Sequence, residues 1–122
     1  MKQIIIMTLF SSIFGVTAQQ IDQIKILEPT NYKNAINNKN VQLIDVRTSG
    51  EFNSGHIKNA QNVDIFKRKA FVAYFKKLDT DKPIYLYCRS GSRSQRAAKL
   101  LVKLGFKEIY DLKGGYLNWK SK

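Results

Sequence analysis

The only cysteine of the chain, Cys88, stands between an apolar run and a helical pattern, and this junction constrains the fold more than any other feature. Residues 83–87 before it predict a buried strand. Apolar residues spaced three and four positions apart predict a helix over residues 94–104. The loop between them reads Cys-Arg-Ser-Gly-Ser-Arg-Ser, so Cys88 is expected at the carboxyl end of a strand, facing the start of a helix.

This loop favours an anionic sulfur at Cys88. Backbone N–H groups at a helix N-terminus and the positive end of the helix dipole attract negative charge. Arg89 and Arg93 add two positive charges on either side of the loop centre. Gly91 supplies the residue with positive φ that a tight loop of converging N–H groups usually requires. We therefore expect Cys88 to be largely thiolate at neutral pH and to act as a nucleophile.

The rest of the chain alternates strand patterns with helix patterns. Such alternation predicts an α/β domain with a mainly parallel sheet, whose ligand crevice lies beyond the carboxyl ends of the strands. The expected strands are residues 24–27, 41–46, 60–63, 84–87 and 108–110. The expected helices are residues 29–37, 67–78, 94–104 and a short one after residue 115. Residues 48–57 are expected to form a loop.

The first residues predict a secretory signal peptide rather than part of the domain. Lys2 precedes an apolar run over residues 4–16, and the small residues Val16 and Ala18 suit a cleavage site. The run is shorter than a membrane-spanning helix needs. We expect a signal peptide over residues 1–18, a single domain over 19–122, a periplasmic or secreted location and no stable membrane insertion after cleavage.

Composition narrows the classes of function. The formal charge is +12, yet the lysines are scattered without the aromatic-interleaved stripe of a nucleic-acid site, so we expect no nucleic acid partner. The positive field instead attracts small anions. Cys88 has no second cysteine with which to form a disulfide, and with one histidine a metal site is not expected.

Three separated stretches together resemble the rhodanese family of sulfurtransferases. They are residues 43–47 with Glu51 and 55–63; residues 87–94 with Ala97 and Ala98; and residues 104–106 with 112–115 and Trp119. The likeness covers about residues 27–119. It implies a rhodanese-like fold, a small parallel β-sheet flanked by α-helices on both faces. With the signal peptide, the chain resembles the single-domain exported rhodaneses of bacteria.

A neighbouring class, the cysteine-based phosphatases, uses a loop one residue longer. Those enzymes carry Cys-x5-Arg, whereas Cys88 to Arg93 is Cys-x4-Arg and Ser94 occupies the next position. The shorter loop suits the outer sulfur of a persulfide better than three phosphate oxygens. No aspartate stands in an obvious position for a general acid. We therefore interpret the loop as a persulfide cradle.

The resemblance implies thiosulfate sulfurtransferase activity without a cofactor. Cys88 takes the outer sulfur of thiosulfate, a small anionic donor, and passes it to cyanide or a thiol. The residues expected to bind substrate are Arg89, Ser90, Gly91, Ser92 and Arg93, and the supporting residues are Asp45, Arg47, Glu51 and Ser94. The alternative is a sulfur-carrier or redox-sensing module that a thiol-bearing protein partner loads.

The supporting residues have structural interpretations. Asp45 ends its strand and is expected to accept N–H bonds that hold the base of the Cys88 loop. Arg47 and Glu51 are expected to form an ion pair across the intervening turn. Ser92 and Ser94 are expected to cap the helix that follows the loop.

His56 and Trp119 also belong to the family pattern. The histidine is expected to be part of a hydrogen-bonded turn rather than a partner of Cys88. The tryptophan is expected to pack in the core near the site.

Overall fold

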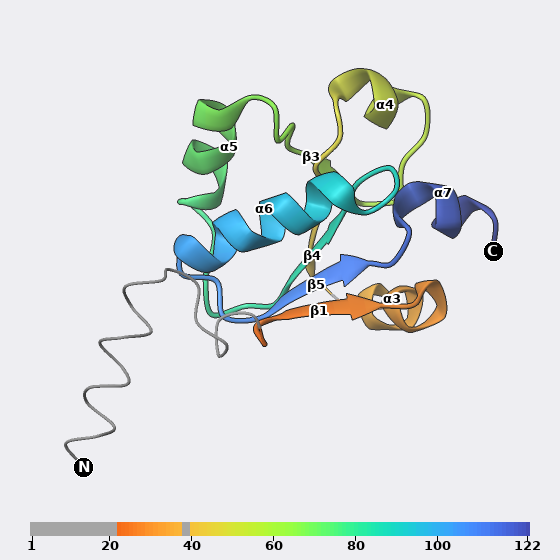
Figure 1. Ribbon diagram of the computed structural model, residues 1–122, viewed down its shortest axis with the longest axis horizontal. Coiled ribbons are helices and arrows are strands. Elements are labelled where there is room, and N and C mark those ends of the chain that lie inside the picture. The colour runs from red at the N-terminus through yellow and green to blue at the C-terminus, as the bar shows by residue number, and fades with distance from the viewer. Residues whose placement is uncertain (1–21, 38–39) are drawn as a thin grey trace, which may run out of the picture.

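The computed structural model describes residues 22–37 and 40–122 (Figure 1). The expected signal peptide therefore lies outside the described residues. Five strands form one sheet in the order β1-β5-β4-β2-β3, and every neighbouring pair is parallel. The strands are β1 (Ile24–Leu27), β2 (Gln42–Asp45), β3 (Gln61–Asn62), β4 (Ile84–Tyr87) and β5 (Ile109–Leu112).

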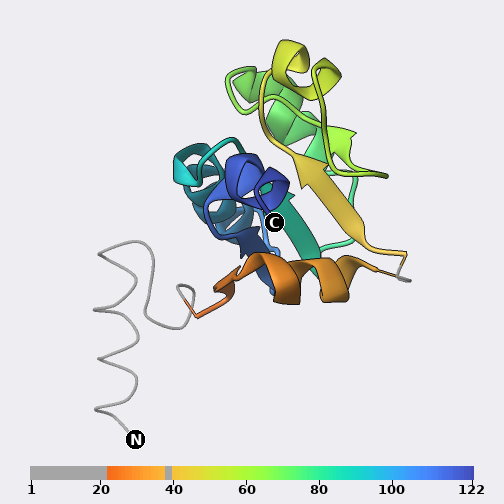
Figure 2. The same cartoon turned by 90° about the vertical axis from the view of Figure 1, so that its right-hand side faces the viewer.

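Helices cover both faces of this sheet (Figure 2). They are α3 (Pro29–Ile36), α4 (Ser49–Asn53), α5 (Arg68–Phe75), α6 (Ser92–Lys103) and α7 (Gly115–Lys120). The core contacts place α5 and α6 on one face and α3 and α7 on the other. The expected α/β fold, with a parallel sheet flanked by helices on both faces, is confirmed.

The central strand β4 contributes side chains to the core on both faces of the sheet, because side chains alternate along a strand. Ile84 and Leu86 pack with α5 and α6, and Cys88 continues this series just beyond the strand. Tyr85 and Tyr87 pack in the second cluster, with α3 and α7. All five residues are buried, so the cysteine is fixed by the core on the side of α6.

Helix α4 lies where the sequence predicted a loop. It begins with a capping box, in which the Thr48 hydroxyl accepts from the Glu51 N–H and the Glu51 carboxylate accepts from the Thr48 N–H. This reciprocal arrangement satisfies donors at the start of a helix too short to show an apolar periodicity. Helix α5 ends at Phe75, shorter than expected, because a turn carries Leu78 into the core.

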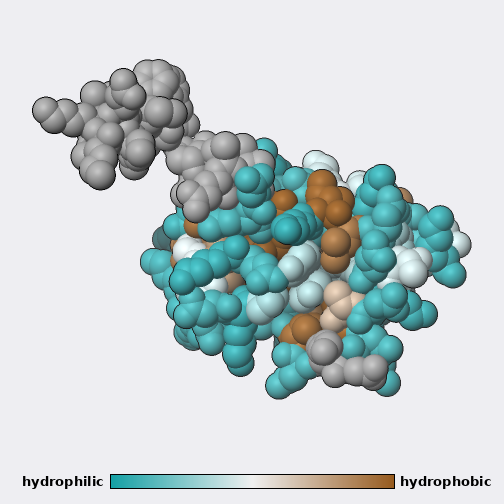
Figure 3. All heavy atoms as spheres, turned by 90° about the horizontal axis from the view of Figure 1, so that it is seen from below, coloured by the Kyte–Doolittle hydropathy of each residue, from teal (hydrophilic) through white to brown (hydrophobic). Residues whose placement is uncertain are grey.

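The surface of the described residues is mostly hydrophilic, with hydrophobic side chains exposed in small patches on the face in Figure 3. The large hydrophobic residues exposed among them are Ile26, Phe66 and Leu117. None of the helices in residues 22–37 and 40–122 has the length and apolar character to cross a bilayer.

Candidate active site

Cys88 lies directly after β4, at the carboxyl edge of the sheet, with only 1% of its surface exposed. The Gly91 backbone N–H donates to its Sγ at 3.0 Å. The thiol in turn donates to Ser94 Oγ at 3.3 Å, and this hydroxyl donates to the Gly91 carbonyl at 3.1 Å. The Cys88 thiol, the Ser94 hydroxyl and the Gly91 backbone therefore form a closed ring of hydrogen bonds within the loop.

Gly91 adopts φ 118°, which confirms the expected positive φ. It occupies the N-cap position of α6, and no side chain caps the helix. The prediction that Ser92 and Ser94 cap α6 is wrong. The helix begins at Ser92, two residues earlier than expected, so both serines lie inside it and the buried Ser94 hydroxyl turns toward the loop.

The backbone N–H groups of the loop form an anion-binding concavity. Within the part of the chain that the structure describes, no carbonyl or side chain accepts from the N–H groups of Arg89, Ser90, Ser92 or Arg93. These donors stand at the N-terminus of the twelve-residue helix α6, where the helix dipole is positive. The arrangement suits a small anion bound next to the sulfur.

Helix α7 fixes this loop from the opposite side. The Tyr116 N–H donates to the Cys88 carbonyl at 2.8 Å and the Leu117 N–H donates to the Arg89 carbonyl at 3.1 Å. A Cβ placed on Gly115 would stand 2.5 Å from the Arg89 carbonyl oxygen. The backbone of α7 therefore contacts the backbone of the Cys88 loop at Gly115. The Cys88 and Arg89 carbonyls point toward α7 and away from the sulfur.

Arg93 is held by Glu51. Its two terminal nitrogens donate to the Glu51 carboxylate at 2.8 and 2.9 Å. This pairing, with the help of Thr48, lowers the pKa of Glu51 to about 2. The prediction of an Arg47–Glu51 ion pair is wrong, because α4 turns the Glu51 side chain toward α6.

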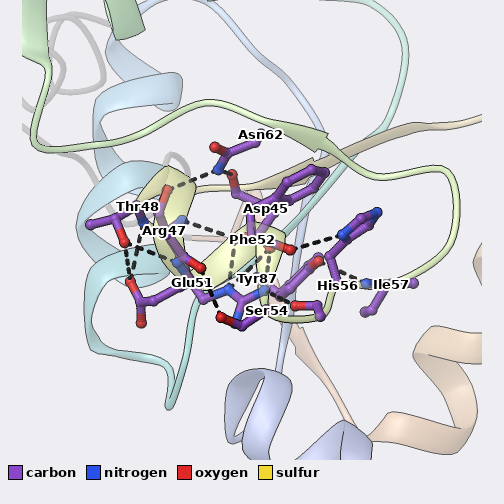
Figure 4. A network of polar contacts seen from close by, with 12 residues as sticks. Asp45, Arg47, Thr48, Glu51, Phe52, Ser54, His56, Ile57, Asn62 and Tyr87 are labelled. Atoms are coloured by element: carbon purple, nitrogen blue, oxygen red, sulfur yellow. Dashed lines mark hydrogen bonds and ion pairs between the residues drawn. The ribbon is translucent and has the colours of Figure 1, made fainter.

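Arg47 pairs with Asp45 instead (Figure 4). Its guanidinium donates to both carboxylate oxygens at 2.6–3.0 Å and to the Gly55 carbonyl at 2.7 Å. It also lies over the Tyr116 ring, 4.5 Å from its centroid. The Asp45 carboxylate accepts from Arg47 and from no N–H of the Cys88 loop among the described residues, so the expected loop-base role is wrong.

The same network shapes the turn after α4 (Figure 4). His56 Nδ1 is 2.9 Å from the Phe52 carbonyl, and the two rings stack at 3.7 Å, as expected for a hydrogen-bonded turn. The Ile57 N–H donates to the Tyr87 hydroxyl at 3.0 Å. Trp119 is partly buried and packs edge-on against Tyr32 of the second cluster, so its predicted core packing is confirmed in part. Residues 22–37 and 40–122 contain no cluster of side chains that would hold a metal ion.

A comparison with protein-family models matches residues 28–122 to the rhodanese-like domain. The match spans more than half of the chain. The chain belongs to the rhodanese-like family. Its relatives include the thiosulfate sulfurtransferase GlpE of Coxiella burnetii, which is 36% identical over 86 residues, 70% of this chain and 78% of GlpE.

The uncharacterized protein YqhL of Bacillus subtilis is 46% identical over 84 residues. That alignment covers 69% of this chain, which spans 64% of YqhL. Among solved structures, a rhodanese-like domain protein from Staphylococcus aureus aligns with a TM-score of 0.68 and 26% identity. The superposition covers 78% of this chain and 90% of that one.

The structure brings together residues that the sequence placed far apart. The cradle residues 88–94 lie in one loop as expected, and Glu51 joins them through Arg93. Gly115 was missed as a member of this site. The Gly-Gly pair at 114–115 was a signal for close backbone approach.

Proposed function

We propose that this rhodanese-like domain transfers a sulfane sulfur from thiosulfate to a thiophilic acceptor, such as cyanide or a thiol, through a persulfide on Cys88. The observation that carries this proposal is the cradle itself. One backbone N–H already donates to Sγ, and four neighbouring N–H groups at the N-terminus of α6 have no acceptor among the described residues. The family membership and the sulfurtransferase relative support the same chemistry.

The first half-reaction is a displacement on sulfur. The Cys88 thiolate attacks the outer sulfur of thiosulfate, a new S–S bond forms, and the old S–S bond breaks with its electron pair leaving on sulfite. The product is Cys88–S–S⁻. The loop N–H groups stabilise this anion as an oxyanion hole stabilises an alkoxide.

The second half-reaction restores the enzyme. An acceptor such as cyanide attacks the terminal sulfur, and thiocyanate leaves while the electron pair of the S–S bond returns to Cys88. Each half-reaction releases one product before the next substrate reacts, so the scheme is ping-pong.

The two arginines of the loop have different surroundings. Arg89 is exposed at the mouth of the cradle and supplies long-range attraction for a dianion. Arg93 donates two hydrogen bonds to the Glu51 carboxylate, and these bonds hold its guanidinium at the side of the cradle. A phosphatase requires an arginine that clasps phosphate oxygens, so this pairing favours sulfur transfer over phosphoryl transfer.

Intact mass spectrometry tests the proposal. Incubation with thiosulfate is expected to add the mass of one sulfur atom, and cyanide is expected to remove it with formation of thiocyanate. Cys88→Ser is the control and should show neither event. An unchanged mass of the native protein after exposure to thiosulfate would overturn the assignment of the donor.

We further propose that residues 1–18 direct the chain to a periplasmic or extracellular location and are cleaved after Ala18. The support is the charge and apolar pattern of those residues alone. N-terminal sequencing of the protein expressed from its full reading frame is expected to begin at Gln19. Recovery of the intact N-terminus from the exported fraction would contradict cleavage.

A further inference from the structure

Helix α6 lies across one face of the sheet (Figure 1), and its outer side carries a row of cations. They recur at intervals of three or four residues, so they are neighbours along one side of the helix. The row consists of Arg93, Arg96, Lys99 and Lys103. Helix α6 contains no aspartate or glutamate. Like charges at this spacing repel one another, so the row weakens the helix unless acidic groups from outside it lie nearby.

Most of these cations have no carboxylate partner. Within residues 22–37 and 40–122, no ion pair involves Arg96, Lys99 or Lys103, and all three side chains are exposed. The same is true of Arg68 at the start of α5. Clustered charges of one sign attract a surface of the opposite sign and fix its orientation. This part of the surface therefore favours an acidic partner.

A hollow of about 230 Å³ lies among these unpaired cations. Ile65, Phe66 and Leu100 supply its apolar lining, and the unpaired cations of α5 and α6 supply the rest. Phe66 is 62% exposed, the highest value among the large hydrophobic side chains of the described residues. Exposed aromatic side chains beside a hollow are typical anchors of protein interfaces. The hollow therefore suits one apolar side chain with carboxylates around it.

This surface adjoins the mouth of the cradle. The Arg93 guanidinium lies over the Phe66 ring, with its Cζ 5.6 Å from the ring centroid. Arg89 is exposed at the same mouth. Cys88 is 1% exposed, so an acceptor meets the outer sulfur of a persulfide rather than Sγ. Contacts beside the mouth orient the acceptor for that approach.

We propose that a basic face, made of Phe66, Arg68, Arg96, Lys99 and Lys103, binds an acidic segment of the thiol protein that accepts the sulfur. One apolar side chain of that segment occupies the hollow. The proposal rests on the proposed sulfur transfer and names the class of acceptor. An anionic lipid surface would also match the cations, but it offers no thiol to the cradle.

The transfer step balances without another reactant. The acceptor thiolate attacks the outer sulfur of Cys88–S–S⁻, and a new S–S bond forms. The old S–S bond breaks, and its electron pair returns to Cys88. The acceptor leaves as a persulfide anion, and Cys88 is again a thiolate.

Peptide binding to the unloaded protein tests the docking surface without a sulfur donor. The probe is fluorescein-labelled Glu-Glu-Leu-Ser-Glu-Glu, and its partner probe has glutamine at every glutamate. Fluorescence anisotropy is expected to show saturable binding of the acidic peptide only. Arg96→Gln/Lys99→Gln/Lys103→Gln is expected to weaken this binding about tenfold, because three exposed charge contacts are lost.

A second triple variant controls for net charge. Lys33→Gln/Lys58→Gln/Lys120→Gln removes the same charge from exposed lysines that line hollows beside Trp119. It is expected to bind the acidic peptide nearly as tightly as the native protein. Equal losses in the two variants, or a loss in the control alone, would overturn the assignment to the basic face.

Phe66→Ala tests the apolar anchor. It is expected to weaken binding of the leucine peptide several-fold and to leave binding of a version with serine in place of leucine unchanged. Equal effects on both peptides would overturn the anchoring role. Vesicles of phosphatidylglycerol that bind through Arg96, Lys99 and Lys103, without binding of the acidic peptide, would overturn the protein partner in favour of a membrane.

Peptides with cysteine in place of serine then measure sulfur transfer from the loaded protein. The ratio of kcat/KM for the acidic peptide to that for 2-mercaptoethanol is expected to fall about tenfold in Arg96→Gln/Lys99→Gln/Lys103→Gln. Failure of thiosulfate loading with intact peptide binding would overturn only the donor. Normal loading without a preference for the acidic peptide would overturn only the docking surface.

Discussion

The Glu51 carboxylate accepts hydrogen bonds from both terminal nitrogens of Arg93, at 2.8 and 2.9 Å, across 42 positions of sequence. The same carboxylate closes the capping box of α4 by accepting from Thr48. One side chain therefore ties the N-terminus of α4 to the first turn of α6. The position of the arginine beside the cradle depends on a short helix on another part of the chain.

Replacing Glu51 by Gln is expected to remove this ion pair while keeping the capping box. Side-chain exposures of 28% for Glu51 and 18% for Arg93 leave the pair partly screened. We expect a loss of about 0.5–1 kcal/mol in the free energy of unfolding at neutral pH. Urea unfolding measures it, with Lys107→Gln, which breaks an exposed pair with Asp81, as a near-neutral control.

The same pair predicts a pH dependence of stability. The pKa of Glu51 is lowered from 4.5 to about 2 by folding, so the unfolded chain binds more protons between these values. Its contribution is therefore complete above pH 4.5 and is lost as the pH falls toward 2. The difference in unfolding free energy between native protein and Glu51→Gln should shrink over this window. A difference that stays constant down to pH 2 would contradict the assignment.

Gly115→Ala is expected to displace the Cys88 loop. The new Cβ would stand 2.5 Å from the Arg89 carbonyl oxygen, and the residue has φ 64°. Strain and displaced backbone predict a loss of about 2–4 kcal/mol in stability, with sulfurtransferase turnover reduced well beyond what the unfolded fraction explains. Gly50→Ala, where a Cβ meets nothing within 4 Å, is the matched control and should retain both properties.

Gly91→Ala tests the loop conformation without a steric clash. Only the Gly114 nitrogen, at 4.0 Å, lies within reach of an added Cβ, but φ is 118°. The expected cost of about 1–2 kcal/mol is therefore conformational. If the loop relaxes to a negative φ, the hydrogen bond from the Gly91 N–H to Sγ is lost. The rate of persulfide formation should then fall by more than the loss of folded protein explains. A rate that falls only in proportion to the folded fraction would argue that Gly91 matters only for folding.

Asp45→Asn is expected to destabilise the fold without removing the chemistry. Both members of the Asp45–Arg47 pair are buried, and the change leaves a cation without its anion. We expect a loss of about 3–5 kcal/mol in unfolding free energy. Because Asp45 bonds Arg47 rather than the Cys88 loop, the folded fraction should keep near-native activity at low temperature. A fully folded but inactive variant would restore a role for Asp45 in the loop.

Several features of this fold were predictable because they depend on local sequence. The four apolar residues of β4 and the periodicity of α6 placed Cys88 between a strand and a helix, and the structure confirms both elements. Gly91 was predictable for the same reason, since only a residue without Cβ readily adopts its φ. Helix α4 was not, because its five residues carry no apolar period and its capping box competes with ordinary turn patterns.

The sequence by itself determined the position of the lone thiol, its loop length and the strand–loop–helix unit, since each follows from neighbouring residues. Only the tertiary structure decided the partners of the charged side chains. In the folded chain Arg47 pairs with Asp45 and Arg93 pairs with Glu51. Charge pairing in a packed interior depends on which side chains the sheet order and helix positions bring within a few ångströms. That distance is a property of the whole fold.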